Sequence, residues 1–280
     1  MARWSSLRRL IADPLGLLGL VLVVLIVLAA ALSPWISPYD PNHISIMERL
    51  KPPSAAHWLG TDQLGRDLLS RVLVGSRIAL LVAAVTIGVS LVGGIVLGLL
   101  AGYGPRWLDA ILVLLFDSIR SFPTVMFGLA VVTILGPSLN TIMVIIIVFS
   151  VPGYARIVRT QTMSLKGTEF VMAERSLGAG MVRVLAVHIL PNLIGPLLIL
   201  ASMDIPSVIT IEAGLSFLGL GVRAPLASWG SILNDGYSFI RDTDWLVISA
   251  GVPLILATLG FTFLGESLRD IFDPRLRKDL

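Results

Sequence analysis

Six long apolar stretches alternate with polar segments along the chain, and this pattern predicts its architecture. The apolar stretches cover residues 15–32, 78–103, 108–135, 141–158, 191–214 and 245–265. A helix of about 20 apolar residues crosses the hydrocarbon core of a membrane, so each stretch can span it once. The pattern predicts an all-α, polytopic membrane protein with six transmembrane helices. A cleaved signal peptide is the rival interpretation of 15–32, but Ser33-Pro34-Trp35 is a poor cleavage site.

The distribution of basic residues predicts the orientation, because cytoplasmic loops of membrane proteins are enriched in Lys and Arg. Both termini are expected in the cytoplasm. The predicted divisions are a cytoplasmic N-terminus 1–14, a first transmembrane helix 15–32, a periplasmic segment 33–77 with an interfacial helix, a core 78–265 of five transmembrane helices that includes a cytoplasmic loop 159–190, and a cytoplasmic tail 266–280. The segment 33–77 fits this scheme least well, since it also carries five basic residues.

Composition narrows the functional classes. Of 280 residues, 55% are hydrophobic and only 14% are charged, against about 25% charged in soluble domains. The sequence has no cysteine, which excludes disulfides, cysteine-ligated metals and thiol catalysis. It has no G-x-x-x-x-G-K-[ST] run, so no nucleotide site of that kind is expected. The net charge of +3 is spread over several loops and does not indicate nucleic-acid binding.

One polar stretch between two predicted spans, 166–192, has the pattern of helix, glycine and helix. We expect Thr168 to cap a short helix with its side chain, and Glu169 and Arg175 to lie at the helix ends that favour their charges. Gly178 suits a left-handed stop. A second short helix over 181–190 is expected to end before Pro191. Apolar positions at i, i+3 and i+7 form one stripe, which suits either the groove of a soluble partner or a membrane interface: Phe170, Ala173 and Leu177.

Charged residues inside predicted spans are costly and are usually paired or functional. Asp117 and Arg120 lie three residues apart, so we expect them to neutralise each other. Asp204 and Glu212 in the fifth span are tentative residues of a translocation pathway, although Asp204 could equally be hydrogen-bonded to a neighbouring helix. Before the second span, a helical pairing of Asp67 with Arg71 is expected.

The 166–192 stretch resembles the coupling-loop motif of ABC importer permeases, in which a Glu-Ala-Ala triplet is followed three residues later by Gly and then by an Ile-x-x-Pro relative. The corresponding residues here are Met172-Ala173-Glu174, Gly178 and His188-Ile189-Leu190-Pro191-Asn192. The triplet departs from the family pattern, because Met172 stands first and the acid comes two positions later. Other stretches resemble the dipeptide, oligopeptide and nickel branch, and in particular the second, C-type permease of a peptide importer. They are the tail LRDIFDPRLRK, the run GLSFLGLG at 214–221, and the residues Gly60, Thr61, Asp62, Gly65, Arg66, Asp67, Ser70 and Arg71.

This resemblance implies a type I ABC importer permease fold and a transport subunit, not an enzyme, in a bacterial plasma membrane. It implies four kinds of partner: a second homologous permease subunit, two ATP-binding subunits, an extracytoplasmic solute-binding protein and the lipid bilayer. ATP and Mg would bind the partner subunits, with no cofactor bound directly. The residues that the resemblance and the helix pattern assign to ATPase coupling are Thr168, Glu169, Phe170, Met172, Ala173, Glu174, Arg175, Leu177, Gly178 and Pro191.

The cargo favoured by the sequence is a di- or oligopeptide. Nickel or another small solute is the alternative, although no His or Cys cluster within a span offers a transition-metal site. A proton-coupled secondary transporter remains a further alternative, in which Asp117, Asp204 or Glu212 would carry the proton. An intramembrane enzyme is disfavoured, because the three histidines lie outside the predicted spans.

Overall fold

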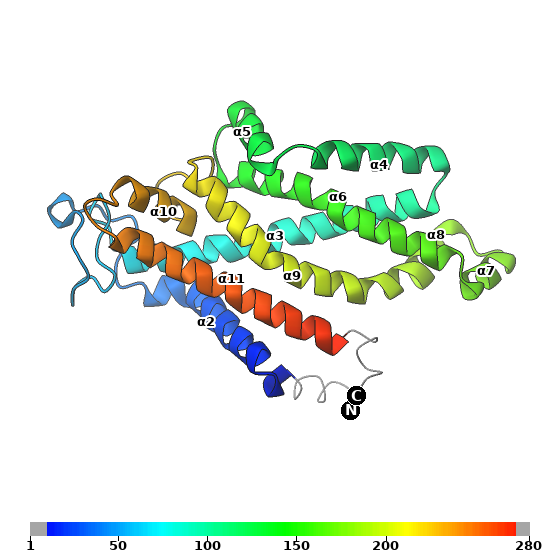
Figure 1. The fold of residues 1–280 in the computed structure, drawn as a ribbon, viewed down its shortest axis with the longest axis horizontal. Helices are drawn as coiled ribbons and strands as arrows, with labels where there is room; N and C mark the ends of the chain where they lie inside the picture. Colours follow the sequence, from blue (N-terminus) through cyan, green and yellow to red (C-terminus); the bar gives the residue numbers. More distant parts are fainter. Residues whose placement is uncertain (1–9, 273–280) are drawn as a thin grey trace. The chain divides into compact units, whose positions relative to one another are not determined.

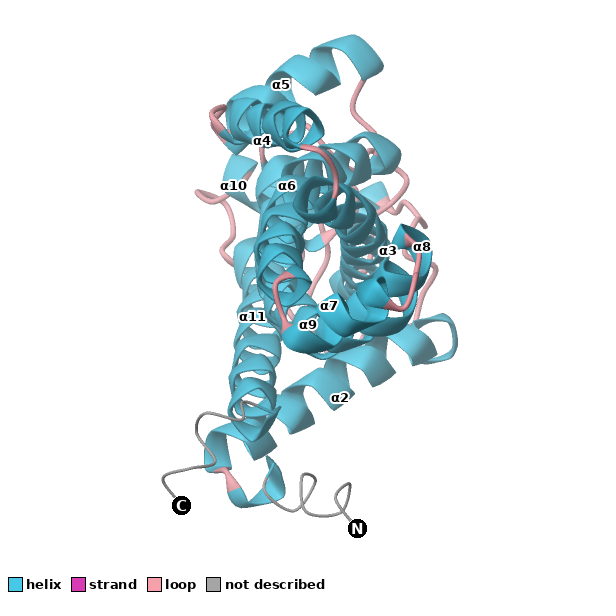
Figure 2. Cartoon of the chain, turned by 90° about the vertical axis from the view of Figure 1, so that its right-hand side faces the viewer, coloured by secondary structure: helices cyan, strands magenta, loops and turns pink. Residues whose placement is uncertain are grey.

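The structure is a computed structural model that describes residues 10–272. Helices follow one another along this part of the chain, joined by loops, and no β-strand occurs in it (Figures 1 and 2). The elements are α2 (Pro14–Ile36), the short 3-10 helix η1 (Ile46–Glu48), α3 (Leu68–Tyr103), α4 (Arg106–Arg120), α5 (Thr124–Leu135), α6 (Leu139–Lys166), α7 (Glu169–Ser176), α8 (Met181–Arg183), the π-helical segment η2 (Val184–Ile189), α9 (Leu190–Phe217), α10 (Trp229–Ser238) and α11 (Trp245–Phe272).

Within the described residues, five helices are long and apolar enough to cross a membrane, or six spans if a bent pair is counted as one. The prediction of an all-α membrane protein is therefore confirmed. The predicted continuous third span is wrong in its geometry, because α4 and α5 meet at an angle of 91°. Pro123 accounts for the break, since it excludes the preceding residue from the helical region and cannot donate a backbone hydrogen bond.

Two prolines lie inside helices without ending them. α6 runs through Pro152, and Pro191, before which the second short helix was expected to end, is the second residue of α9. In the second case the preceding turn is π-helical, over Val184–Ile189. Its wider hydrogen-bond register differs from that of an α-helix, so a residue without a backbone N–H can follow without ending the helix.

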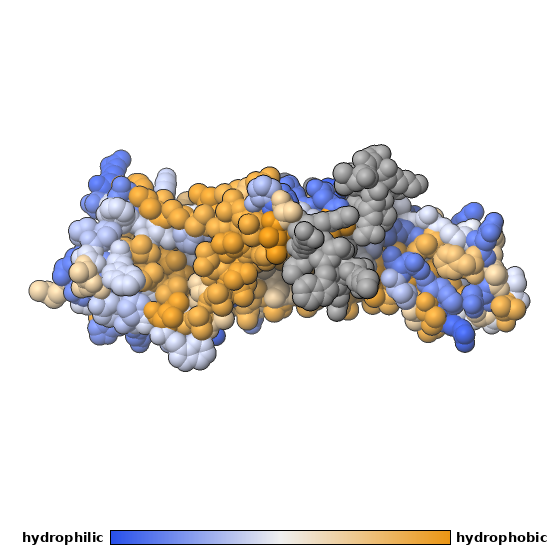
Figure 3. Space-filling model, turned by 90° about the horizontal axis from the view of Figure 1, so that it is seen from below, coloured by the Kyte–Doolittle hydropathy of each residue, from blue (hydrophilic) through white to orange (hydrophobic). Residues whose placement is uncertain are grey.

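Contacts divide the chain into two compact units, the first comprising Met1–Ala84, Gly128–Met143 and Ser202–Leu280. In this unit α2 packs along α11. The two backbones come close at Gly19, where an added methyl group would lie 2.6 Å from the Leu264 amide nitrogen. The outward faces of the same helices carry many exposed Leu, Val and Ile side chains, seen as a broad apolar surface in Figure 3. Such a surface suits contact with lipid.

A buried tryptophan organises the other end of the first unit. Trp229, at the start of α10, is 1% exposed, and its indole Nε1 donates to the Val72 carbonyl oxygen of α3 at 3.0 Å. The preceding Ser228 caps α10, and a reciprocal bond from its backbone N–H to the hydroxyl of Ser231 completes a capping box. α10 in turn packs on α11. These contacts hold the start of α3 and the segment before α11 in one structure.

The second unit comprises Val85–Phe127 and Val144–Ala201. Here α3 meets α6 through a row of glycines spaced four residues apart, Gly94, Gly98 and Gly102, each of which faces residues of α6. Small residues at this spacing allow two membrane helices to approach closely. A methyl group added at Gly98 would lie 2.5 Å from the Ala155 carbonyl oxygen and 2.6 Å from Val158 Cβ.

Charged residues of α4 pair with α6 in the same unit. Asp109 forms a two-point ion pair with Arg159, in which Nη2 donates to Oδ2 at 2.7 Å, and Asp117 pairs with Arg156. The predicted Asp117–Arg120 pair is wrong, because α6 offers Asp117 a cation from a neighbouring helix. These pairs neutralise charges that would be costly in an apolar environment.

Candidate functional site

The segment between α6 and α9, all within the second unit, is built as the sequence pattern indicated. α7 covers Glu169–Ser176, with Glu169 in its first turn and Arg175 in its last. Gly178 has a φ of +87°, its N–H donates to the Arg175 carbonyl, and the Ala179 N–H donates to the Glu174 carbonyl. This pair of bonds is the Schellman motif, which satisfies carbonyls at a helix end and requires a left-handed residue. The predicted glycine stop is confirmed.

One expectation about this helix is wrong. Thr168 is the N-cap residue of α7, but its side chain does not accept a bond from the helix. Its hydroxyl donates instead to the carbonyl oxygen of Leu165 at 2.6 Å. That carbonyl lies in the last turn of α6, where carbonyl groups lack helical partners. Thr168 therefore ties α7 to the end of α6.

α7 has one buried anchor and a large apolar exposed face. Val171 is fully buried, whereas the Phe170, Met172 and Leu177 side chains are 45%, 50% and 84% exposed, and Ala173 beside them is also exposed. Leu177 is the C-cap residue, so the stripe runs one residue beyond the helix. Exposure of this much apolar side chain on a short helix is typical of a surface that binds another protein.

Two contacts attach this segment to long helices. Lys166 Nζ donates to the Tyr103 carbonyl oxygen at 2.9 Å and lies 4.9 Å from the centre of the Tyr103 ring, so the end of α6 is fixed to the end of α3. Glu174 Oε2 lies 3.5 Å from His188 Nε2, and α7 packs on the π-helical segment that contains this histidine. Neither contact could be predicted from the sequence, because the partners are distant in the chain or lie in a turn predicted to be α-helical.

Three other residues assigned to ATPase coupling lie on α7 or at the start of α9. Glu169 and Arg175 are exposed on α7, and Pro191 is exposed at the start of α9. Glu174, which stands where the family pattern has Ala, faces His188 rather than the apolar stripe. The segment thus presents an apolar stripe outward and uses Glu174 for an internal contact.

The two tentative pathway residues lie in different environments, both in the first unit. Glu212 is 1% exposed, and its Oε1 accepts a bond from the Ser216 hydroxyl at 2.7 Å. Asp204 is half-buried, and no described residue forms an ion pair or hydrogen bond with its carboxylate. The burial of Glu212 indicates a structural role in this chain, and Asp204 stays a candidate for the pathway.

The signature before α3 folds into a polar network. Asp62 accepts from Arg66 Nε at 2.6 Å, and the same oxygen lies 3.3 Å from Arg71 Nε. The predicted Asp67–Arg71 pair is wrong: Asp67 instead contacts His57 at 2.9 Å and accepts from the Ser70 hydroxyl at 2.8 Å. A tight loop brings His57 back to Asp67, and this is a tertiary contact that helical spacing does not predict.

His57 also lies 3.2 Å from Glu48, so its ring is held between two carboxylates. Burial opposes the charged ring, but the hydrogen bonds to Asp67 and Glu48 outweigh it and raise the pKa of His57 above its ordinary value. The same contact with His57 lowers the pKa of Glu48. Among residues 10–272, no group of three or more His, Asp or Glu side chains is arranged to hold a metal ion.

Comparison with protein families identifies two matching models. Residues 94–278 match the binding-protein-dependent transport system inner membrane component. Residues 3–53 match the N-terminal TM domain of oligopeptide transport permease C. Together these matches cover the N-terminal helix and most of the rest of the chain.

Curated relatives resemble the chain over nearly its whole length. The dipeptide transport system permease protein DppC of Alkalihalophilus pseudofirmus is 36% identical over 98% of this chain and 90% of that protein. The probable D,D-dipeptide transport system permease protein DdpC of Escherichia coli is 38% identical over 94% and 88%. The di/tripeptide transport system permease protein DppC of Pseudomonas aeruginosa is 38% identical over 92% and 88%.

Among solved structures, a chain of the MetNI methionine ABC transporter in an inward-facing conformation has the same fold. It aligns with a TM-score of 0.59 and 20% identity, covering 74% of this chain and 97% of that one. The type I importer fold expected from the sequence is thereby confirmed. The matching family models, the identity to curated permeases and the shared fold show that the chain belongs to the family of binding-protein-dependent transport system inner membrane components, the permease subunits of ABC importers.

Proposed function

We propose that this chain is one of two permease subunits of an ATP-driven importer of di- or oligopeptides, and that α7 docks on an ATPase subunit. The observation that carries the proposal is the exposed apolar stripe of α7, in a loop predicted to be cytoplasmic. The relatives named as dipeptide and di/tripeptide permeases support the peptide cargo. A second permease, two ATP-binding subunits and an external binding protein complete the proposed assembly, and ATP is hydrolysed on the partners.

The contacts around α7 suggest how motion would be transmitted. Movement of a docked ATPase would displace α7, and the Glu174–His188 contact would pass this displacement to the π-helical start of the fifth span. The Lys166–Tyr103 bond would pass it to the end of α3. A binding protein would select the cargo, so the membrane pathway would need only to alternate its access. Asp204 is a candidate residue of that pathway.

Co-purification tests the docking step. Full burial of a leucine side chain contributes about 1.5–3 kcal/mol, so replacing the 84% exposed Leu177 by Asp should weaken ATPase binding by roughly tenfold or more. The tagged chain is expressed with its neighbouring genes, purified in detergent and assayed for bound ATPase. Leu177→Asp should lose the ATPase. Val182→Asp, a change at an 80% exposed residue of α8 outside the stripe, is the matched control and should retain it.

Transport measurements separate this proposal from a secondary transporter. Liposomes that contain the complete assembly should take up labelled dipeptide only when ATP is present on the side of the membrane where the ATPase subunits lie. If the chain alone moved peptide in response to a proton gradient, and no ATPase ever bound it, the proposal would be wrong. Asp117, Asp204 and Glu212 would then be the residues to examine as proton carriers.

A further inference from the structure

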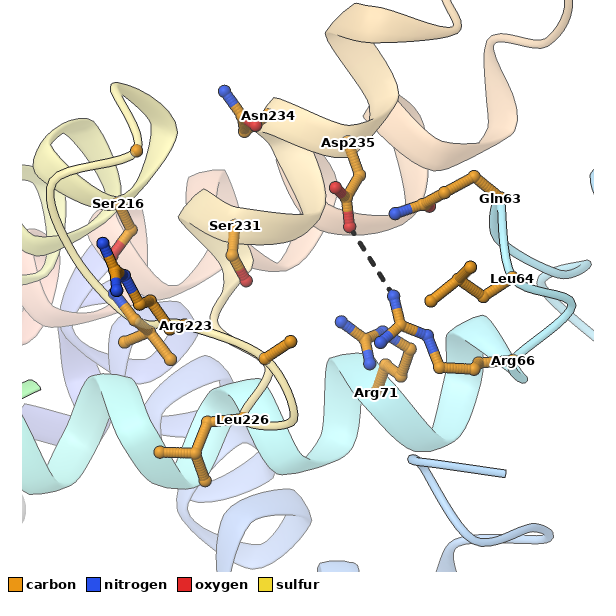
Figure 4. Close-up of a pocket in the computed structure, with 13 residues that line it drawn as sticks. Gln63, Leu64, Arg66, Arg71, Ser216, Arg223, Leu226, Ser231, Asn234 and Asp235 are labelled. Carbon is orange, nitrogen blue, oxygen red and sulfur yellow. Dashed lines mark hydrogen bonds and ion pairs between the residues drawn. The ribbon is translucent and has the colours of Figure 1, made fainter. Parts of the chain in front are cut away.

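A cavity of about 300 Å³ lies within the first unit (Figure 4). Its walls are the start of α3, the loop that follows α9, and the helix α10. The loop before α3 and its first turn contribute much of the polar wall, through Gln63, Arg66 and Arg71. Asp235 of α10 and Arg223 of the loop supply further charged groups. The predicted topology places these segments on the external side of the membrane. Coupling to an ATPase does not involve this end of the chain.

Several polar groups of the cavity are already engaged, and others are not. Asn234 donates to the Phe217 carbonyl, and the Ser216 hydroxyl donates to Glu212. Arg71 is engaged as well, since its Nε lies 3.3 Å from Asp62 Oδ2 and its Nη1 donates to the Pro41 carbonyl oxygen at 3.3 Å. By contrast, the buried Gln63 Oε1 forms no hydrogen bond with any described residue. No ion pair within residues 10–272 involves Arg223, which is exposed. The unengaged groups are therefore the Gln63 amide oxygen and the Arg223 guanidinium.

The charges of the cavity are unbalanced. Three arginines, Arg66, Arg71 and Arg223, stand against two carboxylates, those of Asp235 in the wall and Asp62 behind it, which leaves an excess of one positive charge. Arg66 and Arg71 are only 5% and 2% exposed, and Figure 4 shows their guanidinium groups beside each other. Asp62 forms ion pairs with both of these arginines and Asp235 lies 3.9 Å from Arg66, so the unbalanced positive charge is that of Arg223. An anionic group bound in the cavity would supply Arg223 with a counter-charge.

The side of the cavity away from Arg223 carries a carboxylate that can accept a cation. Figure 4 places Arg223 at one side and Asp235 with Gln63 at the other. The Gln63 side chain forms a hydrogen bond with the Asp235 carboxylate. Arg66 Nη2 lies 3.9 Å from Asp235 Oδ2, which is too long for a hydrogen bond, so this carboxylate can accept a further donor. Burial raises the pKa of Asp235, so an added positive partner would favour its charged form. Leu64, Val222 and Leu226 supply apolar wall between the charged groups.

We propose that this cavity binds the charged ends of a short peptide, with the carboxylate held by Arg71 and Arg223 and the ammonium group by Asp235 and Gln63 Oε1. The inference rests on the proposed function, because it identifies the ligand as cargo. The volume agrees with this assignment, since pockets for small molecules begin at about 300 Å³. The site would receive peptide on the external side before it enters the membrane pathway.

Direct binding tests the proposal without transport. The membrane assembly is purified in lipid nanodiscs without the external binding protein, and equilibrium dialysis measures binding of radiolabelled alanyl-alanine. Saturable binding is expected. Because a charge-assisted hydrogen bond is worth about tenfold in affinity, alanyl-alaninamide should compete at least about tenfold more weakly than unlabelled alanyl-alanine. Equal competition by the amide would overturn the role of the two arginines.

Variants locate the site while Asp62, Arg66 and Arg71 are left unchanged. Arg223→Gln and Asp235→Asn should each weaken alanyl-alanine binding about three- to fivefold, as expected for partly solvated ion pairs. Arg241→Gln removes the same charge from an exposed residue outside the cavity and should leave binding unchanged. An unchanged affinity in both cavity variants would refute the assignment. If alanyl-alanine does not bind, and Arg223→Gln instead weakens attachment of the external binding protein, the cavity holds an acidic side chain of that protein and the proposal is wrong.

The result is independent of the docking experiment. Peptide binding is measured without ATP and does not require the ATPase to remain attached. A chain that fails to retain an ATPase can still bind alanyl-alanine in this assay, and an assembly that retains its ATPase can still fail to bind it. The two proposals can thus fail separately.

Discussion

The close approach of α3 to α6 can be tested with two glycines of the same helix. Gly98 faces α6, and a methyl group there would meet the Ala155 carbonyl oxygen at 2.5 Å and Val158 Cβ at 2.6 Å. Gly88 also lies inside α3, but no atom lies within 4 Å of a methyl group added to it. Gly88→Ala and Gly98→Ala therefore make the same chemical change with and without a packing conflict.

The expected difference in stability between the two variants follows from this comparison. Replacing Gly by Ala inside a helix favours the helix by up to about 1 kcal/mol in both variants, so this contribution cancels between them. Overpacking costs about 1–3 kcal/mol, and the neighbours of Gly98 include backbone, which cannot rotate away. Gly98→Ala should thus be about 1–3 kcal/mol less stable than Gly88→Ala. At about 2–4 °C per kcal/mol for chains near this size, the apparent melting midpoint should fall by roughly 2–12 °C.

Intrinsic fluorescence of the six tryptophans reports the midpoint in nanodiscs, with both variants heated at one scan rate because membrane proteins often unfold irreversibly. Gly88→Ala should match or exceed the unmodified chain. If Gly98→Ala melts at the same temperature as Gly88→Ala, the glycine row does not form a tight helix contact. The arrangement of the second unit would then need revision.

Two further predictions concern the contacts of Glu174 and of His57. Glu174→Gln removes the charge that faces His188, 3.5 Å away, but leaves the exposed stripe intact. Peptide uptake should fall several-fold while the ATPase still co-purifies. Loss of the ATPase itself would show that Glu174 belongs to the docking surface. The raised pKa of His57 predicts that its contacts with Asp67 and Glu48 stabilise the fold fully below about pH 6.5, the ordinary value, and lose this effect as pH rises through the folded-state pKa. The melting midpoint of the unmodified chain should therefore exceed that of His57→Gln most at pH 5.5 and least at pH 8.5, and a difference that grows with pH would contradict the assignment.

Features that depend on neighbouring residues were predicted from the sequence. Apolar runs of the length needed to cross a membrane identified the spanning helices, because a helix in lipid satisfies its backbone hydrogen bonds within the same run of residues. The apolar stripe and glycine stop of α7 were equally local, since side-chain periodicity and the φ of Gly178 are properties of adjacent residues. The exposed apolar stripe of α7 could therefore be predicted before the fold was known.

Features that depend on distant residues were decided only by the tertiary structure. Sequence spacing paired Asp117 with Arg120, but its partner is Arg156, 39 residues away, and Asp109 and Arg159 are separated by 50. A charge in an apolar environment takes whichever opposite charge packing brings nearest, and short spacing does not specify that choice. The sequence by itself determined the helices and the exposed stripe of α7. Packing decided the pairing of the charges between α4 and α6 and the cavity around Arg66 and Arg71, because both depend on which segments lie side by side.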